Sequence, residues 1–577
     1  MTKSCRGLID DTITIGIGGE AGQGVTRSGS LLGRAFTRSG LYAFGNIDYP
    51  SLIRGGHNYY TLRVAARKVR GFNDRYDLLL ALNKDTIVRH MAEMAPKGGL
   101  VYDSSLEVDE DSMVGLQLFP IPMGEIIKTI GGPSIMQNIV GLGAITCLLG
   151  GDLAVLESTI ADEFRGRQRV VEMNIEATRQ GWEAVREHEN SFECHADMGE
   201  RAKRLWLTGN EAVALGCLAA GCNFFAAYPM TPASPVLHWL ASHDEASGMV
   251  VVQPESEIAA VGMALGASYA GAKAMTATSG GGFSLMVESL SLAAMTETPI
   301  VIMLAQRPGP STGMATYSAQ GDALFAIAAG HGEFPRVVLA PGDVEECYSF
   351  TVEAFNLAER FQIPVILLTD KTVVESHETA ESLDPHPDSI YERLDEWEGG
   401  EYQRYQLTES GVSPMVVPGT KNALVLANSN EHTERGFTTT DPKLVTSMAD
   451  KRFRKSPYID EAVEKLQPVK VYGSAKAEVT LVGWGSTKGP ALESMHQLEE
   501  KGHSARFIQV RALEPFPSQM GELLEGAWVL VETNRTGLLG RLIKLHAGKT
   551  PAKTVLKYDG RPLTPLEIEA GALEVAP

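Results

Sequence analysis

The sequence predicts an α/β protein built from three units, each around a parallel β-sheet. Short apolar runs of strand length alternate with stretches of helical periodicity, which is the pattern of parallel sheets covered by helices. Several of these runs end in turns rich in glycine or proline. The chain has 577 residues, of which 44% are hydrophobic. This is enough for about four folding units at ~150 residues each and for a sizeable core.

The first unit is expected over residues 1–190. Apolar strands are predicted at 12–17, 77–82 and 99–103, and the body of a helix at 28–36. Residues 191–205 are polar and charged without strand periodicity, so they are the expected linker.

The second unit is expected over residues 206–376 and the third over residues 471–577, where an apolar run starts at Val479. Residues 377–470 are rich in proline and charged residues and have few strand signals. We therefore expect an irregular connecting segment that could embrace a partner. Strands are predicted at 224–228, 249–253, 274–278, 300–305, 337–340 and 364–370 in the second unit, and at 505–510 and 528–532 in the third.

Charge and cysteine content exclude several classes of protein. There are 51 basic and 71 acidic residues, a net charge of −20, which argues against a nucleic-acid or anionic membrane surface. No apolar run approaches the ~20 residues of a membrane span, and Met1–Cys5 opens no signal peptide, so a cytoplasmic protein is predicted. The six cysteines form no C-x-x-C pair and are expected to be buried, inert thiols.

Two glycine-rich turns lie in the first unit. Residues 16–24 lie between a strand and a helix, where backbone N–H groups can approach a pyrophosphate. The spacing is not G-x-G-x-x-G, and a tight turn that packs the helix on the sheet explains it equally well. Arg54, Gly55 and Gly56 follow Tyr49-Pro50; such an arginine can hold a phosphate or simply be exposed.

In the second unit, residues 228–235 (YPMTPASP) follow a predicted strand. Each proline holds the residue before it in an extended conformation, so this is a rigid loop that presents the Thr231 hydroxyl at a fixed angle. The carboxyl end of a strand is where α/β proteins place their ligands. A merely structural turn needs fewer prolines, and we interpret the loop as functional.

Glu257 begins an apolar helix made of small residues, which we expect to be buried and closely packed. The helix dipole stabilises a carboxylate at this point, while burial desolvates it. Glu255 and Glu257 could simply complement the helix N-terminus, but the buried position favours a tuned acid or base.

Two further loops follow strands of the same predicted sheet. Residues 279–282 (SGGG) offer open backbone donors, and Arg307 follows an apolar strand, where its guanidinium can form a fork with a carboxylate. Each of these segments by itself indicates only a loop. Together, four of them line one edge of the sheet, which is the strongest functional signal in the chain.

These segments resemble the α subunit of 2-oxoacid:ferredoxin oxidoreductases, in the form with a γ domain fused ahead of α. Residues 228–232 match the family motif Y-P-I-T-P, with Met230 in place of isoleucine. Residues 279–288 resemble T-S-G-P-G-x-S-L-M-x-E, with a glycine where proline is usual. Residues 307–316 resemble R-G-G-P-S-T-G-x-x-T, with Pro308 for the first glycine. Gln320-Gly321-Asp322, residues 330–333 and the two glycine-rich turns of the first unit also fit.

The resemblance implies a γ-type domain, a thiamine-diphosphate pyrimidine-type domain and a transketolase C-terminal-like domain, in that order. It implies that Glu257 is catalytic, through a hydrogen bond to N1′ of the aminopyrimidine. Thr231, Arg307 and Thr316 would face the substrate, with Arg307 on a carboxylate. The other residues implied to bind the cofactor are Tyr228, Pro229, Ser279, Gly280, Gly281 and Gly282; those implied for coenzyme A are Gly22, Gly24, Arg54, Gly55 and Gly56.

The implied reaction is oxidation of 2-oxoglutarate with coenzyme A to succinyl-CoA and CO₂, or the reverse carboxylation, with electrons to or from ferredoxin. The fused γ–α arrangement resembles the 2-oxoglutarate enzymes more than the single-chain pyruvate enzymes. A dicarboxylate needs a second cation besides Arg307. His331, Arg54 and the partner are all candidates, and the sequence does not choose among them.

Neither the G-D-G…Asn signature of magnesium–diphosphate binding nor a cysteine set for a [4Fe–4S] cluster occurs in the sequence. The resemblance therefore implies that Mg²⁺ and the cluster belong to a β subunit, that thiamine diphosphate is shared with it, and that the chain is active only in an (αβ)₂ heterotetramer.

Four alternatives remain open from the sequence. One is a pyruvate or branched-chain 2-oxoacid enzyme of the same family. Another is a nicotinamide-dependent dehydrogenase that uses residues 16–24, which a nicotinamide titration would test. A third alternative is a non-catalytic assembly subunit that binds coenzyme A, in which Glu257 would have no role. The fourth is a transketolase-like enzyme, although such an enzyme would carry its own diphosphate motif.

Overall fold

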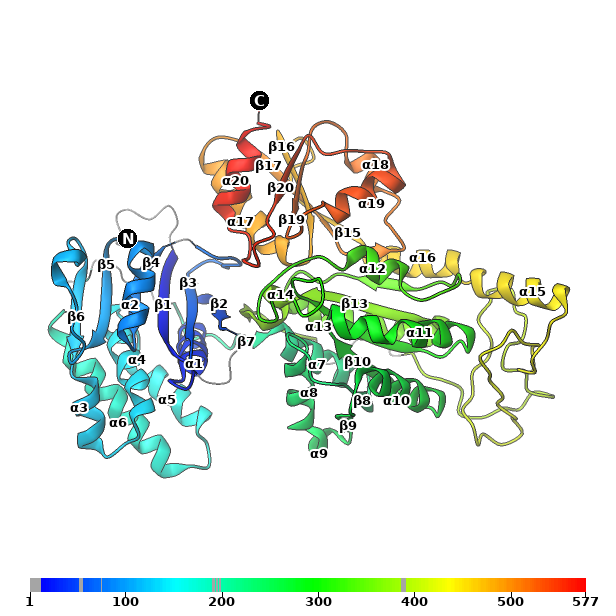
Figure 1. Ribbon diagram of the computed structural model, residues 1–577, viewed down its shortest axis with the longest axis horizontal. Coiled ribbons are helices and arrows are strands. Elements are labelled where there is room, and N and C mark those ends of the chain that lie inside the picture. The colour runs from blue at the N-terminus through cyan, green and yellow to red at the C-terminus, as the bar shows by residue number, and fades with distance from the viewer. Residues whose placement is uncertain are drawn as a thin grey trace. The chain divides into compact units, whose positions relative to one another are not determined.

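The computed structural model (Figure 1) describes residues 12–50, 55–73, 75–188, 192, 196, 199–384 and 391–576. It divides into two compact units. One comprises Met1–Leu207 with Glu375–Ser382, and the other Thr208–Val374 with Leu383–Pro577. The larger unit contains both of the sheets expected for the second and third parts of the chain.

The first unit is built on an eight-stranded sheet in the order β6-β5-β4-β1-β3-β2-β14-β7. The three strands predicted from apolar runs are β1, β4 and β5, which lie side by side in its parallel half. The parallel strand β6, which was not predicted, pairs with β5. The antiparallel half, in which β3 pairs with β1 and β2, and β14 with β2, was not predicted. The strands are β1 (Thr12–Glu20), β2 (Tyr42–Asp48), β3 (His57–Ala65), β4 (Tyr76–Ala81), β5 (Met94–Asp103), β6 (Gln117–Ile121), β7 (Leu205–Thr208) and β14 (His377–Ala380).

Helices cover both faces of this sheet. Neighbouring residues of a strand point to opposite faces. At the end of β1, a Cβ on Gly18 would meet Thr86 of α2, whereas one on Gly19 would meet Val25 of α1. The helices of the unit are α1 (Val25–Arg38), α2 (Lys84–His90), α3 (Met123–Ile130), α4 (Gln137–Leu148), α5 (Leu153–Glu163) and α6 (Gln168–Val185).

The larger unit begins with a seven-stranded sheet in the order β18-β12-β13-β11-β10-β8-β9, with β18 antiparallel to β12. The six strands predicted here are confirmed within two residues at each end. They are β8 (Phe224–Ala226), β9 (Val250–Val252), β10 (Ala274–Thr278), β11 (Ile300–Gln306), β12 (Val337–Leu339) and β13 (Pro364–Asp370). The helices are α7 (Gly209–Ala219), α8 (Ser234–Ala241), α9 (Asp244–Ser247), α10 (Glu257–Tyr269), α11 (Gly280–Met295), α12 (Ala323–Ala328), α13 (Val344–Phe361) and α14 (Lys371–Glu375).

A five-stranded sheet follows in the same compact unit, in the order β15-β17-β16-β19-β20. One apolar cluster holds residues of both sheets, such as Ile302 and Trp484, so the two share a core. The added strand β18 (Ala512–Glu514) also joins the earlier sheet at its edge. The remaining elements are β15 (Val469–Gly473), β16 (Val479–Trp484), β17 (Ala505–Val510), β19 (Val529–Glu532), β20 (Lys553–Leu556), α17 (Lys488–Glu500), α18 (Met520–Leu523), α19 (Leu538–Ala547) and α20 (Pro565–Leu573).

Two expectations about connecting segments need correction. Residues 205–208 form β7, a strand of the first sheet, so the expected linker 191–205 ends inside the fold. Residues 377–470 are not wholly irregular, because they contain β14 and the helices α15 (Pro442–Phe453) and α16 (Ser456–Lys465). Asp441 caps α15 and Pro442 occupies its first turn, a start signal that the sequence already carried.

The α/β class with three largely parallel sheets is thus confirmed. Within the described part of the chain, no helix is long and apolar enough to cross a membrane. Among the described residues, Cys147, Cys217, Cys222 and Cys347 are buried thiols that form no disulfide; Cys5 and Cys194 lie outside the described residues.

Candidate active site

Four loops of the larger unit meet at one edge of its first sheet. Strands β9, β8, β10 and β11 are consecutive neighbours and run parallel, so their carboxyl ends lie on the same side. Residues 228–235 follow β8, Glu257 follows β9, residues 279–282 follow β10, and Arg307 follows β11. The convergence expected from the sequence is therefore present in the fold, at the edge where α/β proteins bind ligands.

Glu257 is the first residue of α10. Ser256 caps this helix, its hydroxyl accepting a hydrogen bond from the backbone N–H of Ala259 at 3.2 Å. Glu257 is only 4% exposed, and among the described residues its Oε1 has no hydrogen-bond partner. Glu255, by contrast, is exposed. A buried carboxylate oxygen left without a donor is costly, so the geometry favours Glu257 over Glu255 as the residue that meets a ligand donor.

The glycine triplet lets α11 begin against two carboxylates. A Cβ on Gly282 would lie 2.5 Å from Glu257 Oε1, and one on Gly280 would lie 2.6 Å from Asp322 Oδ2. Gly281 faces open space. Any larger residue at position 280 or 282 would push a carboxylate away from the start of the helix.

Arg307 and Thr231 come together at this edge. Arg307 Nη1 donates to the carbonyl oxygen of Thr231 at 2.9 Å, and Asn210 Nδ2 donates to the carbonyl oxygen of Pro232 at 3.1 Å. The proline-rich loop is thus held from both sides. Tyr228, at its start, is exposed, and Pro229 is half-buried.

A cavity of about 500 Å³ opens beside these residues. Ser279, Gly280, Gly281 and Arg307 line it, together with Asp322. Partial burial lowers the pKa of Arg307, but a guanidinium remains charged in proteins. Burial raises the pKa of Asp322 to about 6. The resemblance included Asp322 but gave it no role, and only the fold shows that its carboxyl shares a cavity with the Arg307 cation.

Thr316 lies on the segment that connects β11 to α12. It is buried, and among the described residues its hydroxyl has no hydrogen-bond partner. It is not part of the cavity wall formed by Arg307 and Asp322. The structure therefore brings Thr231 and Arg307 together, and places Thr316 on the loop that leads to Asp322.

His331 is not near Arg307. Its backbone N–H donates to Ser291 Oγ at 2.8 Å, and that hydroxyl donates to the His331 carbonyl oxygen at 3.0 Å. Ser291 lies on α11 eleven residues after Gly280, which corresponds to ~16 Å along the helix at ~1.5 Å per residue. His331 is therefore not a candidate for the second cation of the substrate site.

We expected helix α10 to be buried and closely packed, and this expectation is wrong for one of its faces. Ile258 and Met263 on α10 are 58% and 42% exposed, and Leu285 on α11 is 51% exposed. A Cβ on Gly262 or Gly266 would meet nothing within 4 Å. The helix that begins at Glu257 thus presents an uncovered apolar face, the α10/α11 face, formed by these five residues.

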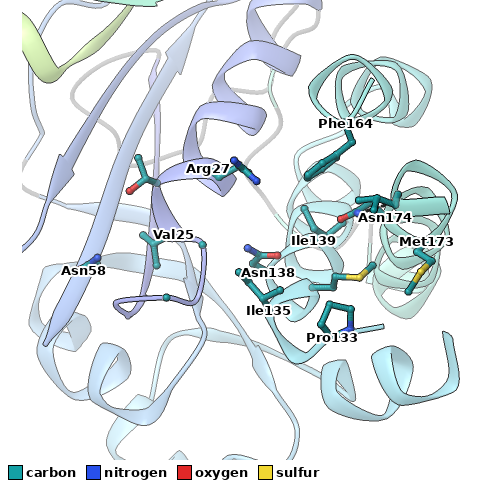
Figure 2. A pocket seen from close by; sticks show the side chains of 15 residues that line it. Val25, Arg27, Asn58, Pro133, Ile135, Asn138, Ile139, Phe164, Met173 and Asn174 are labelled. Atoms are coloured by element: carbon teal, nitrogen blue, oxygen red, sulfur yellow. Dashed lines mark hydrogen bonds between the residues drawn. The ribbon is translucent and has the colours of Figure 1, made fainter. Parts of the chain in front are cut away.

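The first unit contains a second cavity of about 500 Å³ at the carboxyl end of β1. Figure 2 shows Val25, Arg27 and Asn58 on the side of the sheet and α1, facing Ile139, Phe164, Met173 and other apolar side chains of the helices. Gly22 and Gly24, both with positive φ, form part of its rim. Asn58 Oδ1 is buried there and has no partner among the described residues.

Three other residues that the resemblance implied for coenzyme A do not line this cavity or lie outside the described residues. Gly55 and Gly56 precede β3 with positive φ, and they are not among the described residues that line the cavity. Arg54 lies outside the described residues. The apolar helical wall, which includes Ile139 and Phe164, was missed because residues 133–174 carry no motif.

Two family models match the chain. A model described as "Pyruvate flavodoxin/ferredoxin oxidoreductase, thiamine diP-bdg" matches residues 215–451, which include all four loops of the candidate site. A model described as "Pyruvate ferredoxin/flavodoxin oxidoreductase" matches residues 14–184.

Relatives match over nearly the whole chain. The chain is 34% identical to "2-oxoacid:ferredoxin oxidoreductase 2, subunit alpha" of Aeropyrum pernix, over 97% of both chains. It is 28% identical to "2-oxoglutarate oxidoreductase subunit KorA" of Mycobacterium tuberculosis, over 95% of this chain and 89% of the relative. A solved structure of 2-oxoglutarate:ferredoxin oxidoreductase from Magnetococcus marinus, with 2-oxoglutarate, coenzyme A and succinyl-CoA bound, is 34% identical. It covers 98% of this chain and 99% of its own, with a TM-score of 0.89.

Proposed function

The chain belongs to the 2-oxoacid:ferredoxin oxidoreductase family, as an alpha subunit fused with a γ-type domain, and on this premise we propose that it oxidises 2-oxoglutarate. The products are succinyl-CoA and CO₂, with electrons passed to ferredoxin; the same site would run the reverse carboxylation. The observation that carries the choice of substrate is the full-length likeness to the Magnetococcus marinus enzyme that holds 2-oxoglutarate and coenzyme A.

The candidate site fits thiamine diphosphate. The Glu257 Oε1 atom lacks a donor, which the aminopyrimidine would supply, and Gly282 keeps the approach to that oxygen free. Once bound, the cofactor supplies the carbanion chemistry that decarboxylates a 2-oxoacid. This chain would hold the aminopyrimidine with Glu257 and Ser279–Gly282, and the loop from Tyr228 would border it. Glu257 would hold and move a proton at its carboxyl oxygen.

Arg307 and Thr231 would bind the substrate. The guanidinium lies in the cavity next to Ser279 and Gly280, at the end of β11, where it can form a fork with a carboxylate. The Thr316 hydroxyl, which is buried and has no partner in the described part of the chain, would be available to a polar group of the bound substrate. His331 is hydrogen-bonded to Ser291, far along α11 from the cavity. We therefore propose that the second cation for a dicarboxylate comes from Arg54, from the partner subunit or from another residue.

We expect kcat/KM for 2-oxoglutarate to exceed that for pyruvate by at least ~10²-fold. A site built to pair a second carboxylate leaves its own buried charge unpaired when pyruvate binds, and such mismatches are discriminated strongly. The measurement is reduction of a viologen by the complete enzyme with each oxoacid and coenzyme A. A ratio near one, or a preference for pyruvate or a branched-chain oxoacid, would overturn the choice of 2-oxoglutarate.

The cavity of the first unit is our proposed site for part of coenzyme A. Its rim includes Gly22, Gly24 and Arg27 at the start of α1, where a helix N-terminus and a cation favour a phosphate. The opposite wall is apolar and suits the adenine or the pantetheine arm. The unpartnered Asn58 Oδ1 offers an acceptor. Gly55 and Gly56 are not among the described residues that line this cavity. Together with Arg54, they remain proposed coenzyme A residues on a neighbouring loop.

We place a β subunit on the α10/α11 face. This face is apolar, it adjoins Glu257 at the start of α10, and Ile258, Met263 and Leu285 are left exposed on it. Exposed apolar groups that adjoin a site commonly mark a protein interface. The partner would carry the magnesium–diphosphate motif and the [4Fe–4S] cluster that this sequence lacks, in an (αβ)₂ assembly that delivers electrons to ferredoxin.

The isolated chain should bind thiamine diphosphate weakly and be colourless. Glu257 would supply only one end of the cofactor site, and most of the binding free energy for the diphosphate would come from the partner's metal. Isothermal titration of the purified chain, and an absorbance spectrum under anaerobic conditions, check this. Tight binding together with a brown iron–sulfur absorbance would contradict the assignment of these groups to a β subunit.

A further inference from the structure

The five-stranded sheet near the C-terminus carries no recognisable motif, yet it contacts the loop between β11 and α12. This loop, residues 314–322, contains Thr316 and ends at Asp322. Gln320, two residues before Asp322, is completely buried, and its contacts are with the ends of two strands of that sheet.

All four polar groups of Gln320 are hydrogen-bonded to those strand ends. Its Nε2 donates to the carbonyl oxygen of Trp484 at 2.8 Å, and its Oε1 accepts from the backbone N–H of Thr533 at 3.0 Å. Its backbone N–H donates to the Thr533 carbonyl oxygen at 2.9 Å, and its own carbonyl oxygen accepts from Asn534 Nδ2 at 3.2 Å. A fully satisfied buried network of this kind fixes one geometry.

The strand ends that hold Gln320 are themselves fixed. The buried Glu532 carboxylate accepts from Trp484 Nε1 and from Asn534 Nδ2, both at 2.9 Å. Asn534 Oδ1 accepts from the backbone N–H of Gly537 at 2.8 Å. The parallel strands β16 and β19 are therefore hydrogen-bonded to each other through side chains at the ends that meet the loop. We expect these side-chain bonds to make the strand ends rigid.

The other end of the loop is attached to the active-site strand. The backbone N–H of Asp322 donates to Gln306 Oε1 at 2.8 Å, and Gln306 Nε2 donates to the Thr369 carbonyl oxygen at 3.0 Å. Gln306 immediately precedes Arg307. Gln320 thus lies between Thr316 and Asp322 and holds their loop on the C-terminal sheet, while Gln306 attaches Asp322 to the strand that positions Arg307.

We propose that Gln320 is a positioning residue, through which the C-terminal sheet fixes the loop that carries Thr316 and Asp322 at the proposed substrate site. This assigns a role in the reaction to a domain that contributes no residue to the cavity described above. The proposal rests on the proposed function, because it concerns the same substrate site. Misplacing a positioned group by ~1 Å can cost ~10²-fold in rate.

The test compares two buried glutamines at the junction of the same two sheets. Gln320→Met keeps the volume of the side chain and removes both of its hydrogen bonds. Gln509→Met is the matched control: Gln509 is also completely buried, donates to Glu346 Oε2 at 2.8 Å and accepts from the Tyr472 hydroxyl at 3.1 Å, but does not contact the loop. We expect Gln320→Met to lower kcat/KM for the 2-oxoacid ~10²-fold, chiefly through KM, and Gln509→Met to change it less than ~2-fold. Equal effects of the two would overturn the proposal.

A second variant covers the case in which Gln320→Met does not fold. Gln320→Glu has the shape of glutamine, and when protonated its hydroxyl can again donate to the Trp484 carbonyl oxygen. Burial raises the pKa of such a carboxyl, so we expect its kcat/KM relative to wild type to be low at pH 8 and to rise as the pH falls toward 6. A ratio that does not change with pH would contradict the positioning role.

A readout that needs no turnover separates this proposal from the proposed function. Hydrogen–deuterium exchange of backbone amides in residues 314–322, measured on the full α–β complex, should become faster in Gln320→Met and not in Gln509→Met. If the wild-type complex oxidises no 2-oxoacid but the exchange difference is present, the proposed function fails while the positioning role of Gln320 stands. If the enzyme is active but exchange in the loop is unchanged in Gln320→Met, the positioning role is wrong.

Discussion

Replacing Glu257 with glutamine should slow 2-oxoglutarate oxidation by ~10²- to 10⁴-fold, the range for a positioned acid or base. Glutamine keeps the size of the side chain, so the contact of residue 257 with Gly282 is retained. What is lost is the ability of the carboxyl oxygen to hold and move a proton. Thiamine-diphosphate affinity of the complex, measured by titration, should therefore change much less than the rate of viologen reduction.

Glu255→Gln is the matched control for this prediction. Glu255 lies just before the N-cap of α10 and Glu257 is the first residue of that helix. Glu255 is exposed, whereas Glu257 is buried and its Oε1 has no partner among the described residues. Glu255→Gln should leave turnover within ~2-fold of wild type. If it caused the larger loss, the assignment of the acid–base role to Glu257 would be wrong.

The parallel strands could be predicted because strands buried on both faces are made mostly of apolar residues. Strands such as β4, β11 and β13 are buried along their whole length and appear as continuous apolar runs. β2 and β3 were missed, because His57–Ala65 mixes polar and aromatic residues, with half-buried positions at its start. β14 could not be predicted, since its partner β2 lies more than 300 residues earlier in the chain.

The candidate site was predictable to the extent that its residues follow strands. Thr231, Glu257, the glycine triplet and Arg307 each come directly after an apolar run, so topology alone brings them to one edge. Asp322 and Gln320 lie more than ten residues after the end of β11. No pattern in the intervening loop predicts which part of the protein it packs against. His331 was considered as a second cation for the same reason: periodicity does not predict where a polar loop residue lies.

Arg307→Ala should reduce kcat/KM for 2-oxoglutarate by ~30-fold to several thousand-fold, because removing one partner of a hydrogen-bonded charge pair costs about 2–5 kcal/mol. Most of the loss should appear in KM. The variant also loses the bond from Arg307 to the Thr231 carbonyl oxygen, a contribution of about 1 kcal/mol, so the fold should survive with a small drop in Tm. Arg307→Lys keeps the charge but not the planar fork and should recover only part of the loss.

Comparing substrates identifies the carboxylate that Arg307 binds. Arg307 lies in the cavity with Ser279 and Gly280 and donates a hydrogen bond to the Thr231 carbonyl oxygen. Gly282, of the same glycine triplet, approaches the Glu257 carboxylate. We therefore expect it to bind the 1-carboxylate, which every 2-oxoacid shares. Arg307→Ala should then lower kcat/KM for 2-oxoglutarate and for 2-oxobutyrate by similar factors, measured with viologen and a saturating concentration of coenzyme A. A loss confined to 2-oxoglutarate would move Arg307 to the distal carboxylate, and KM values unchanged for both oxoacids would remove it from the substrate site.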